Sequence, residues 1–225
     1  METYKEISFL SQFQHKNIVR YLGTDKSSDN KLYIFLELVS KGSLSSLYQR
    51  YHLGDSQVSV YTRQILSALK YLHERNVVHR DIKCDNILVH VDGSIKLAGF
   101  GLATVTKLND VKSCKGSVLW MAPEMQEIFR IGRGEPPPIP ESFSAHARDF
   151  IIKCLQVNPD KRPTAAQLLN RPFSTILKWE LVKEKQFSQN VIVESDSMDA
   201  IRLVKIDIDK KLEANVGEGE TRRQC

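Results

Sequence analysis

The octapeptide HRDIKCDN at residues 79–86 constrains this chain more than any other stretch, because it gathers several reactive side chains on one short segment. It follows residues 55–76, in which apolar side chains recur at helical spacing. It precedes two short apolar stretches, NILVH and SIKLA, which are separated by the turn signal VDG. Asp81, Lys83 and Asn86 therefore stand on a loop between a predicted amphipathic helix and two segments that are predicted as short strands or loops.

These side-chain types suit phosphoryl transfer from a nucleoside triphosphate, a reaction that depends on positioning and on charge stabilisation. The carboxylate of Asp81 can face an acceptor hydroxyl, Lys83 can contact the moving phosphate, and the amide oxygen of Asn86 can hold magnesium. A lone HRD triplet often arises from loop composition alone. Here the lysine, the asparagine and an APE triplet at residues 122–124 follow it in order, which favours the chemical interpretation.

At these residues the chain resembles a eukaryotic protein kinase, and Lys83 is similar to the lysine of the serine/threonine branch. CKGSVLWMAPE resembles the end of a kinase activation segment, which closes with Glu124. NPDKRPTAAQLL places Arg162 where the family keeps an arginine that pairs with that glutamate. The stretches LYIFLELVSKGSL, RIGRGEPPPIP and QVNPDKRPTAAQLL are similar to plant MAP kinase kinase kinases of the MEKK group.

The resemblance implies an ATP and Mg²⁺ site with a role for each matching residue. Asp81 would be the catalytic base, Lys83 the phosphate contact and Asn86 a metal ligand. The implied ATP-binding residues are Leu36, Glu37, Val39, Leu88 and Glu6. Backbone groups of Glu37 and Val39 would hydrogen-bond adenine, Leu36 would limit the pocket behind it, and Leu88 would form the floor of the pocket. Glu6 would be the glutamate of the small-lobe helix. His79, Phe100, Glu124 and Arg162 would be structural. The implied partner is a MAP kinase kinase.

The chain departs from the family pattern in four places. Gly99, in KLAGFGLA, stands where the family has its magnesium-binding aspartate. No G-x-G-x-x-G stretch precedes the hinge. We also expect no strand with the ATP-binding lysine before Glu6, and Lys5, on the same helix as Glu6, cannot replace that lysine. APEM runs directly into QEIFRIGRG, which indicates an internal deletion after residue 125. These departures predict impaired catalysis. The alternative is a pseudokinase or interaction fragment that binds partner kinases without catalysis.

We therefore predict an α+β, protein-kinase-like two-lobe fold that is incomplete. Residues 1–40 would form the remnant of the small lobe, with a helix to about residue 14 and a hairpin of strands at 17–23 and 31–39, followed by the hinge. Residues 41–173 would form a mostly helical large lobe without its central helix, and residues 174–225 an unrelated tail. Further helices are predicted over 55–76, 144–156 and 164–173, and the KGSL stretch as a turn.

Composition narrows the remaining possibilities. No apolar run reaches the roughly 20 residues of a membrane span, and a dispersed net charge of +5 gives no nucleic-acid surface. Four scattered cysteines without a CxxC pair fit a reducing, cytoplasmic location. Ser113 and Ser117 are candidate phosphorylation sites or ordinary surface serines. In the tail, NVIVESDSMDAIRLVK resembles a piece of the ribonuclease H fold with Asp196 as metal ligand, or is an amphipathic helix with an acidic cap.

Overall fold

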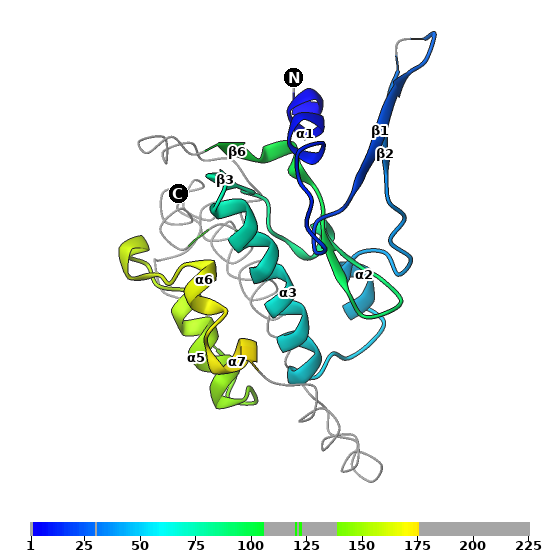
Figure 1. The fold of residues 1–225 in the computed structure, drawn as a ribbon. Helices are drawn as coiled ribbons and strands as arrows, with labels where there is room; N and C mark the ends of the chain where they lie inside the picture. Colours follow the sequence, from blue (N-terminus) through cyan, green and yellow to red (C-terminus); the bar gives the residue numbers. More distant parts are fainter. Residues whose placement is uncertain (1, 30, 106–119, 121, 123–138, 176–225) are drawn as a thin grey trace, which may run out of the picture. The chain divides into compact units, whose positions relative to one another are not determined.

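The computed structural model describes residues 2–29, 31–105, 120, 122 and 139–175. The chain divides into two compact units, one of residues 1–51, 60–116 and 165–170, the other of residues 52–59, 117–164 and 171–225. Helices and strands both occur among the described residues, which confirms the predicted α+β class (Figure 1). The divisions at residues 40 and 173 stay predictions, and the deletion after residue 125 falls outside the described residues.

The helices and strands of the first unit follow in chain order. They are α1 (Glu2–Leu10), β1 (Tyr21–Lys26), β2 (Leu32–Leu36), α2 (Leu44–Tyr48), most of α3 (Asp55–His73), β3 (Val77–Val78), β4 (Ile87–Val89), β5 (Ile95–Leu97), β6 (Thr104–Val105) and α6 (Ala165–Leu168). Two short 3₁₀ helices, η1 (Cys84–Asn86) and η2 (Phe100–Leu102), lie beside β4 and after β5 in the chain. The second unit holds α5 (Ala145–Cys154), η4 (Pro159–Lys161) and α7 (Pro172–Thr175).

Strands β4 and β5 form an antiparallel pair, the β4–β5 ribbon, at the centre of the first unit. Alternate residues of a strand point to opposite faces. The residues of one face are all buried: Ile87, Val89, Ile95 and Leu97. Leu88 and Lys96 are paired across the ribbon on its other face. The turn between the strands contains Gly93 at φ +79, a left-handed conformation that suits glycine.

Two segments from other parts of the chain extend the β4–β5 ribbon into a wider sheet. On the β5 side, the Val19 amide donates to the Leu97 carbonyl at 2.9 Å, and Ile18 bridges Leu97 in parallel. On the β4 side, the Lys41 amide donates to the Val89 carbonyl, also at 2.9 Å. The ribbon therefore holds residues 17–19 at one edge and residues 41–43 at the other.

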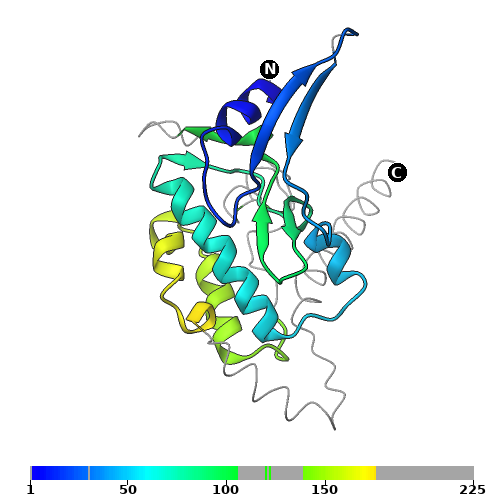
Figure 2. The same ribbon diagram turned by 45° about the vertical axis from the view of Figure 1, so that its right-hand side comes forward.

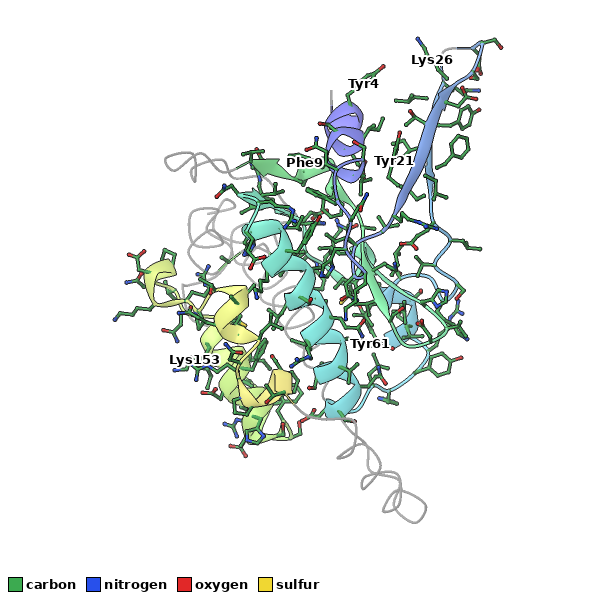
Figure 3. All side chains as sticks on the ribbon, in the orientation of Figure 1. Tyr4, Phe9, Tyr21, Lys26, Tyr61 and Lys153 are labelled. Atoms are coloured by element: carbon green, nitrogen blue, oxygen red, sulfur yellow. The ribbon has the colours of Figure 1, made fainter. Side chains whose placement is uncertain are left out.

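The β1–β2 hairpin is the small-lobe element predicted from the sequence, but its first strand lies later than expected. β1 begins at Tyr21 and includes the polar residues up to Lys26, which the sequence had indicated as part of the connecting loop. Residues 17–19 belong to the sheet around β5 instead, because that position buries Ile18 and Val19 almost completely. Tyr21 lies near the base of the hairpin and Lys26 near its tip (Figure 3). Figure 2 shows the hairpin tip reaching beyond the rest of its unit.

Two helices of the first unit end earlier than predicted, and a third helix, α2, was not predicted. Helix α1 ends at Leu10 rather than near residue 14, because a turn at residues 11 and 12 leads into the extended segment beyond. Helix α3 ends at His73, and buries Tyr61 and Leu72 as its periodicity predicted. The predicted KGSL turn leads into α2, where the hydroxyl of Ser43 accepts the Ser46 amide at 3.2 Å as an N-cap.

The second unit is built around a small apolar core. Its members are Phe143, Ala147 and Phe173, with Val58, Ile139, Phe150 and Ile151 packed against them. The hydroxyl of Ser144 caps α5, which confirms the predicted helix there, by accepting the Ala147 amide at 3.2 Å. The single helix predicted over 164–173 is divided into α6 and α7, and Pro172 begins the second piece. None of the helices described has both the length and the apolar character needed to cross a membrane.

Candidate active site

The loop between β3 and β4 holds the three side chains that the sequence singled out for phosphoryl transfer. Lys83 places its Nζ 3.0 Å from Oδ2 of Asp81. The side-chain amide of Asn86 donates to the same Oδ2 and to the Asp81 carbonyl oxygen, both at 2.8 Å. The Asp81 and Lys83 side chains are 12% and 23% exposed, so the pair is partly shielded from water. The structure thus brings these three predicted residues together in one hydrogen-bonded group.

His79 is a buried, neutral residue that contacts the backbone of this loop. Its Nδ1 accepts the Asp81 amide at 3.3 Å, so its Nε2 carries the proton and donates to the Ala98 carbonyl at 2.9 Å. Burial lowers the pKa of His79 to about 4, although the bond to Ala98 opposes this shift. The imidazole also meets the Phe100 ring edge-on at 4.7 Å. This geometry suits the structural role implied for His79 and Phe100.

Gly99 stands two residues after the end of β5, and its backbone adopts a left-handed conformation at φ +75. A Cβ atom at this position would lie 2.5 Å from Oδ1 and 2.8 Å from Nδ2 of Asn86. Real Cβ atoms essentially never approach other heavy atoms this closely, so the amide of Asn86 fills the space where a side chain at position 99 would begin.

This arrangement does not fit a magnesium ion of the kind that the family resemblance implies. Mg²⁺ prefers carboxylate and phosphate oxygens in an octahedral shell, whereas position 99 offers no carboxylate and Asn86 offers one neutral oxygen. Among the described residues, no group of three His, Cys, Asp or Glu side chains is placed to bind a metal ion. The residues present therefore do not form the expected metal centre.

Glu6 reaches the turn after Gly99 from helix α1. Its Oε1 accepts the Phe100 amide at 3.2 Å, so the helix contacts the backbone of the turn directly. Aromatic packing positions the helix: the rings of Phe9 and Phe13 stack at 5.8 Å, and Phe13 lies 5.5 Å from Phe100. Glu6 had been assigned to the ATP site from the resemblance, and the contact found here is with the turn that carries Gly99.

The predicted hinge residues lie at the end of β2 and just beyond it. Leu36 is the last residue of β2 and pairs with Tyr21. The Glu37 amide donates to the Arg20 carbonyl at 2.9 Å, while the Glu37 carboxylate accepts the Arg20 amide at 2.8 Å. Among the described residues, no hydrogen bond uses the Glu37 carbonyl or the Val39 amide. These two backbone groups are the ones that the resemblance assigns to adenine.

Lys96 is a part of this region that sequence reasoning missed. Its Nζ lies 2.8 Å from Oε1 of Glu37, and Leu88, the predicted floor of the adenine pocket, is its cross-strand partner. One weak signal was available: Lys96 is the only charged residue in the apolar stretch SIKLA. Nothing in the sequence indicated that the partner would be Glu37.

The remaining predicted residues lie in the second unit or outside the described part of the chain. Arg162 donates twice to the Gln156 carbonyl, from Nε at 3.1 Å and from an η nitrogen at 2.7 Å. Glu124, its predicted partner, lies outside the described residues, as do Ser113, Ser117 and Asp196. The roles assigned to these residues stay predictions.

Comparison with known proteins gives one family and a consistent set of relatives. Residues 1–128 match the family described as protein kinase domain. Mitogen-activated protein kinase kinase kinase 1 of Arabidopsis thaliana is 53% identical, over 75% of this chain and 34% of the relative. Mitogen-activated protein kinase kinase kinase 3 of the same plant is 48% identical, over 75% of this chain and 37% of the relative. Mitogen-activated protein kinase kinase kinase 1b of Physcomitrium patens is 46% identical, over 76% of this chain and 27% of the relative. The match thus spans about a third of the relatives' length.

Proposed function

The chain belongs to the protein kinase family, and on that premise we propose that it carries a serine/threonine kinase site of MAP kinase kinase kinase type with impaired catalysis. ATP would be the phosphate donor, and the hydroxyl group of a MAP kinase kinase the acceptor. The names of the relatives support this choice of reaction and partner. The group formed by Asp81, Lys83 and Asn86 is the structural observation on which the proposal rests.

In the proposed reaction Asp81 accepts the proton of the attacking serine or threonine hydroxyl. A bond forms between that oxygen and the γ-phosphorus of ATP, and the bond from this phosphorus to the β–γ bridging oxygen breaks, which releases ADP. Lys83 lies 3.0 Å from the Asp81 carboxylate and supplies positive charge beside the phosphate in transfer. The Asn86 amide donates to the Asp81 carboxylate and to the Asp81 carbonyl, and it would thereby orient the carboxylate for the hydroxyl.

The impairment follows from the missing carboxylate at position 99. A bound divalent cation stabilises developing charge in such transfers by several kcal/mol, and Gly99 provides no carboxylate for it. A loss of about 5 kcal/mol in transition-state stabilisation slows a reaction by more than a thousandfold. We therefore expect phosphate transfer by this chain to be far slower than by a kinase with a complete site.

The test compares phosphate incorporation into a MAP kinase kinase, from labelled ATP, by the wild-type chain and by Asp81→Asn. The proposal expects slow incorporation by the wild type that disappears in Asp81→Asn. Asp92→Asn is the matched control, because Asp92 is an exposed aspartate in the turn of the β4–β5 ribbon and caps only the Ser94 amide and His90. Equal incorporation by the wild type and Asp81→Asn would show that the signal does not come from this site.

A second candidate function is binding of partner kinases without catalysis, and the contact between Gly99 and Asn86 favours it. The Asn86 amide fills the space beside Gly99, and Glu6 accepts the Phe100 amide, so these side chains already have protein contacts at the place where the family resemblance puts a metal ligand. A melting temperature unchanged at saturating MgATP, with retained binding of a MAP kinase kinase by both the wild type and Asp81→Asn, would favour this function. A clear stabilisation by MgATP would favour the catalytic one.

A further inference from the structure

The ion pair between Glu37 and Lys96 joins the hinge to the β4–β5 ribbon. The two residues are 59 positions apart in the chain, yet Oε1 and Nζ lie 2.8 Å apart, and each side chain is only 19% exposed. We propose that Lys96 is a positioning residue for adenine: through Glu37 it fixes the hinge backbone above Leu88. This inference rests on the proposed function, in so far as the hinge is an adenine site.

Glu37 is the point at which three segments of the chain meet. Its carboxylate accepts Lys96 from β5 and the Arg20 amide from the segment before β1, while its own amide donates to the Arg20 carbonyl. Burial by itself would raise the pKa of the Glu37 carboxyl, but the hydrogen bonds from Lys96 and Arg20 and their positive charges bring it below its ordinary value. The carboxylate is therefore ionised and engaged at neutral pH.

The other end of the hinge is fixed to the opposite edge of the same ribbon. The Lys41 amide donates to the Val89 carbonyl, and the Val89 amide donates to the Gly42 carbonyl, both at 2.9 Å. The chain therefore crosses the ribbon between Glu37, held on the β5 side, and Gly42, held on the β4 side. Leu88 and Lys96 are paired on the same face of that ribbon.

The apolar side chain of Leu38 does little to hold the hinge between these two ends. Leu38, the residue that follows Glu37, is 89% exposed, so its side chain adds almost no buried contact. Charge-assisted hydrogen bonds in a partly shielded place are stronger than neutral ones. The Glu37–Lys96 pair is thus the contact best placed to set the distance between the hinge backbone and the floor at Leu88.

The experiment measures binding of adenosine and inosine to the full 225-residue chain by titration calorimetry. Neither nucleoside carries phosphate, so the missing carboxylate at position 99 does not affect the result. Inosine lacks the 6-amino group that would donate to the Glu37 carbonyl, so the ratio of the two affinities reports hinge geometry. General destabilisation would lower both affinities without a selective loss for adenosine.

For the wild type we expect tighter binding of adenosine than of inosine. Lys96→Met should weaken adenosine binding about tenfold and reduce the preference, because one charge-assisted hydrogen bond is lost. Lys96→Arg keeps the charge and should restore the preference. Glu37→Gln should act like Lys96→Met, and the double variant should lose no more than either single variant, because both break the same contact.

Lys70→Met is the matched control, since Lys70 pairs with Glu74 at 3.7 Å on the exposed side of α3 and should leave both affinities unchanged. An unchanged preference in Lys96→Met, failure of Lys96→Arg to restore it, or a wild type that does not prefer adenosine would each overturn the inference. Failure of the proposed kinase function would instead appear as absent phosphate incorporation alongside intact adenosine preference.

Discussion

The side-chain amide of Asn86 occupies the position from which a side chain at residue 99 would extend, 2.5 Å from the place of its Cβ. The Nδ2 atom of the same amide, 2.8 Å from that Cβ position, donates two hydrogen bonds of 2.8 Å to Asp81. The glycine and the orientation of the loop that carries Asp81 are therefore linked. Any larger residue at position 99 has to displace the group that orients the Asp81 carboxylate.

Gly99→Ala should consequently destabilise the chain by about 2–4 kcal/mol, from left-handed strain plus the disturbed Asn86 hydrogen bonds. Gly93→Ala is the control, because Gly93 has nearly the same φ, +79, but no atom lies within 4 Å of its Cβ position. That variant should lose only about 1 kcal/mol. Urea unfolding of both variants gives the comparison. Equal losses would mean that the collision with Asn86 contributes nothing.

Acidification should weaken the fold through His79. The folded chain holds His79 neutral with a pKa of about 4, against about 6.5 when unfolded, so the unfolded state binds more protons between these values. The His79 contribution is thus complete above about pH 6.5 and is lost as the pH falls toward 4. The unfolding free energy should therefore fall by about 2 kcal/mol when the pH is lowered from about 7.5 to 5.

His79→Gln has no group that titrates in this range, so its unfolding free energy should depend less on pH by that amount. His15 and His73, whose pKa values burial also lowers, are present in both proteins and cancel in the comparison. Denaturant unfolding of both proteins at the two pH values measures the difference. Parallel pH profiles would contradict the assignment of His79 as a buried neutral residue.

The buried amide pair of Asn17 and Gln64 should be energetically coupled. The side-chain amide of Asn17 donates to Oε1 of Gln64 at 2.8 Å and to the Ile95 carbonyl at 3.0 Å, and the Ile95 amide donates to the same Oε1. Asn17→Ala should cost about 2–3 kcal/mol, since it removes both hydrogen bonds of the Asn17 amide and takes the side-chain donor from the Ile95 carbonyl, whereas Oε1 of Gln64 keeps the Ile95 amide. A double-mutant cycle with Gln64→Ala should give a coupling of about 1 kcal/mol.

Gln12→Ala is the comparison for this cycle, because Gln12 is exposed and bonds only to the Ser8 carbonyl one helical turn away. Its effect on the unfolding free energy should stay within about 0.5 kcal/mol. If Asn17→Ala behaved like Gln12→Ala, or if the cycle showed no coupling, the amide pair would not be a stabilising link between the segment after α1, α3 and β5.

The β1–β2 hairpin should promote self-association of this chain. Its two strands pair only with each other among the described residues, and Leu22, Tyr33 and Phe35 are all at least 47% exposed on it. Open strand edges next to exposed apolar side chains favour pairing between molecules. Phe35→Lys should therefore lower the concentration dependence of the apparent mass in light scattering. Leu38→Lys is the control, because it removes a more exposed apolar residue outside the strands, and it should change this concentration dependence little. An equal effect of the two changes would point to general apolar attraction and contradict a role of the strand edges.

Much of the first unit could be predicted from the sequence, because its signals are local. The helical spacing of Tyr61 and Leu72 predicted α3, and the turn signal VDG between NILVH and SIKLA was placed correctly, although these stretches were predicted only as short strands or loops and not as a paired ribbon. The order of residues in HRDIKCDN predicted which side chains would meet around Asp81. In each case the pattern spans only a few turns or strands.

The errors and omissions come from contacts between distant residues. Ile18 has the character of a hairpin strand, and only its pairing with Leu97, 79 positions later, places it elsewhere. Sequence reasoning found Gly99 but not the Asn86 amide that fills the space beside it, because that depends on the left-handed backbone of the turn. The pairing of Glu37 with Lys96 likewise depends on how the hinge crosses the ribbon.

The sheet around the β4–β5 ribbon has a consequence for how this protein can change during evolution. The chain leaves the sheet after Val19 at one edge and returns at Lys41 at the other, so everything between is an excursion from a continuous scaffold. Three strand spacings of about 4.8 Å separate these edges, a gap that five or six extended residues could bridge. A change in the length of the β1–β2 hairpin should thus leave the scaffold beneath Asp81 intact, whereas a change at Glu37 also breaks its ion pair with Lys96 on that scaffold.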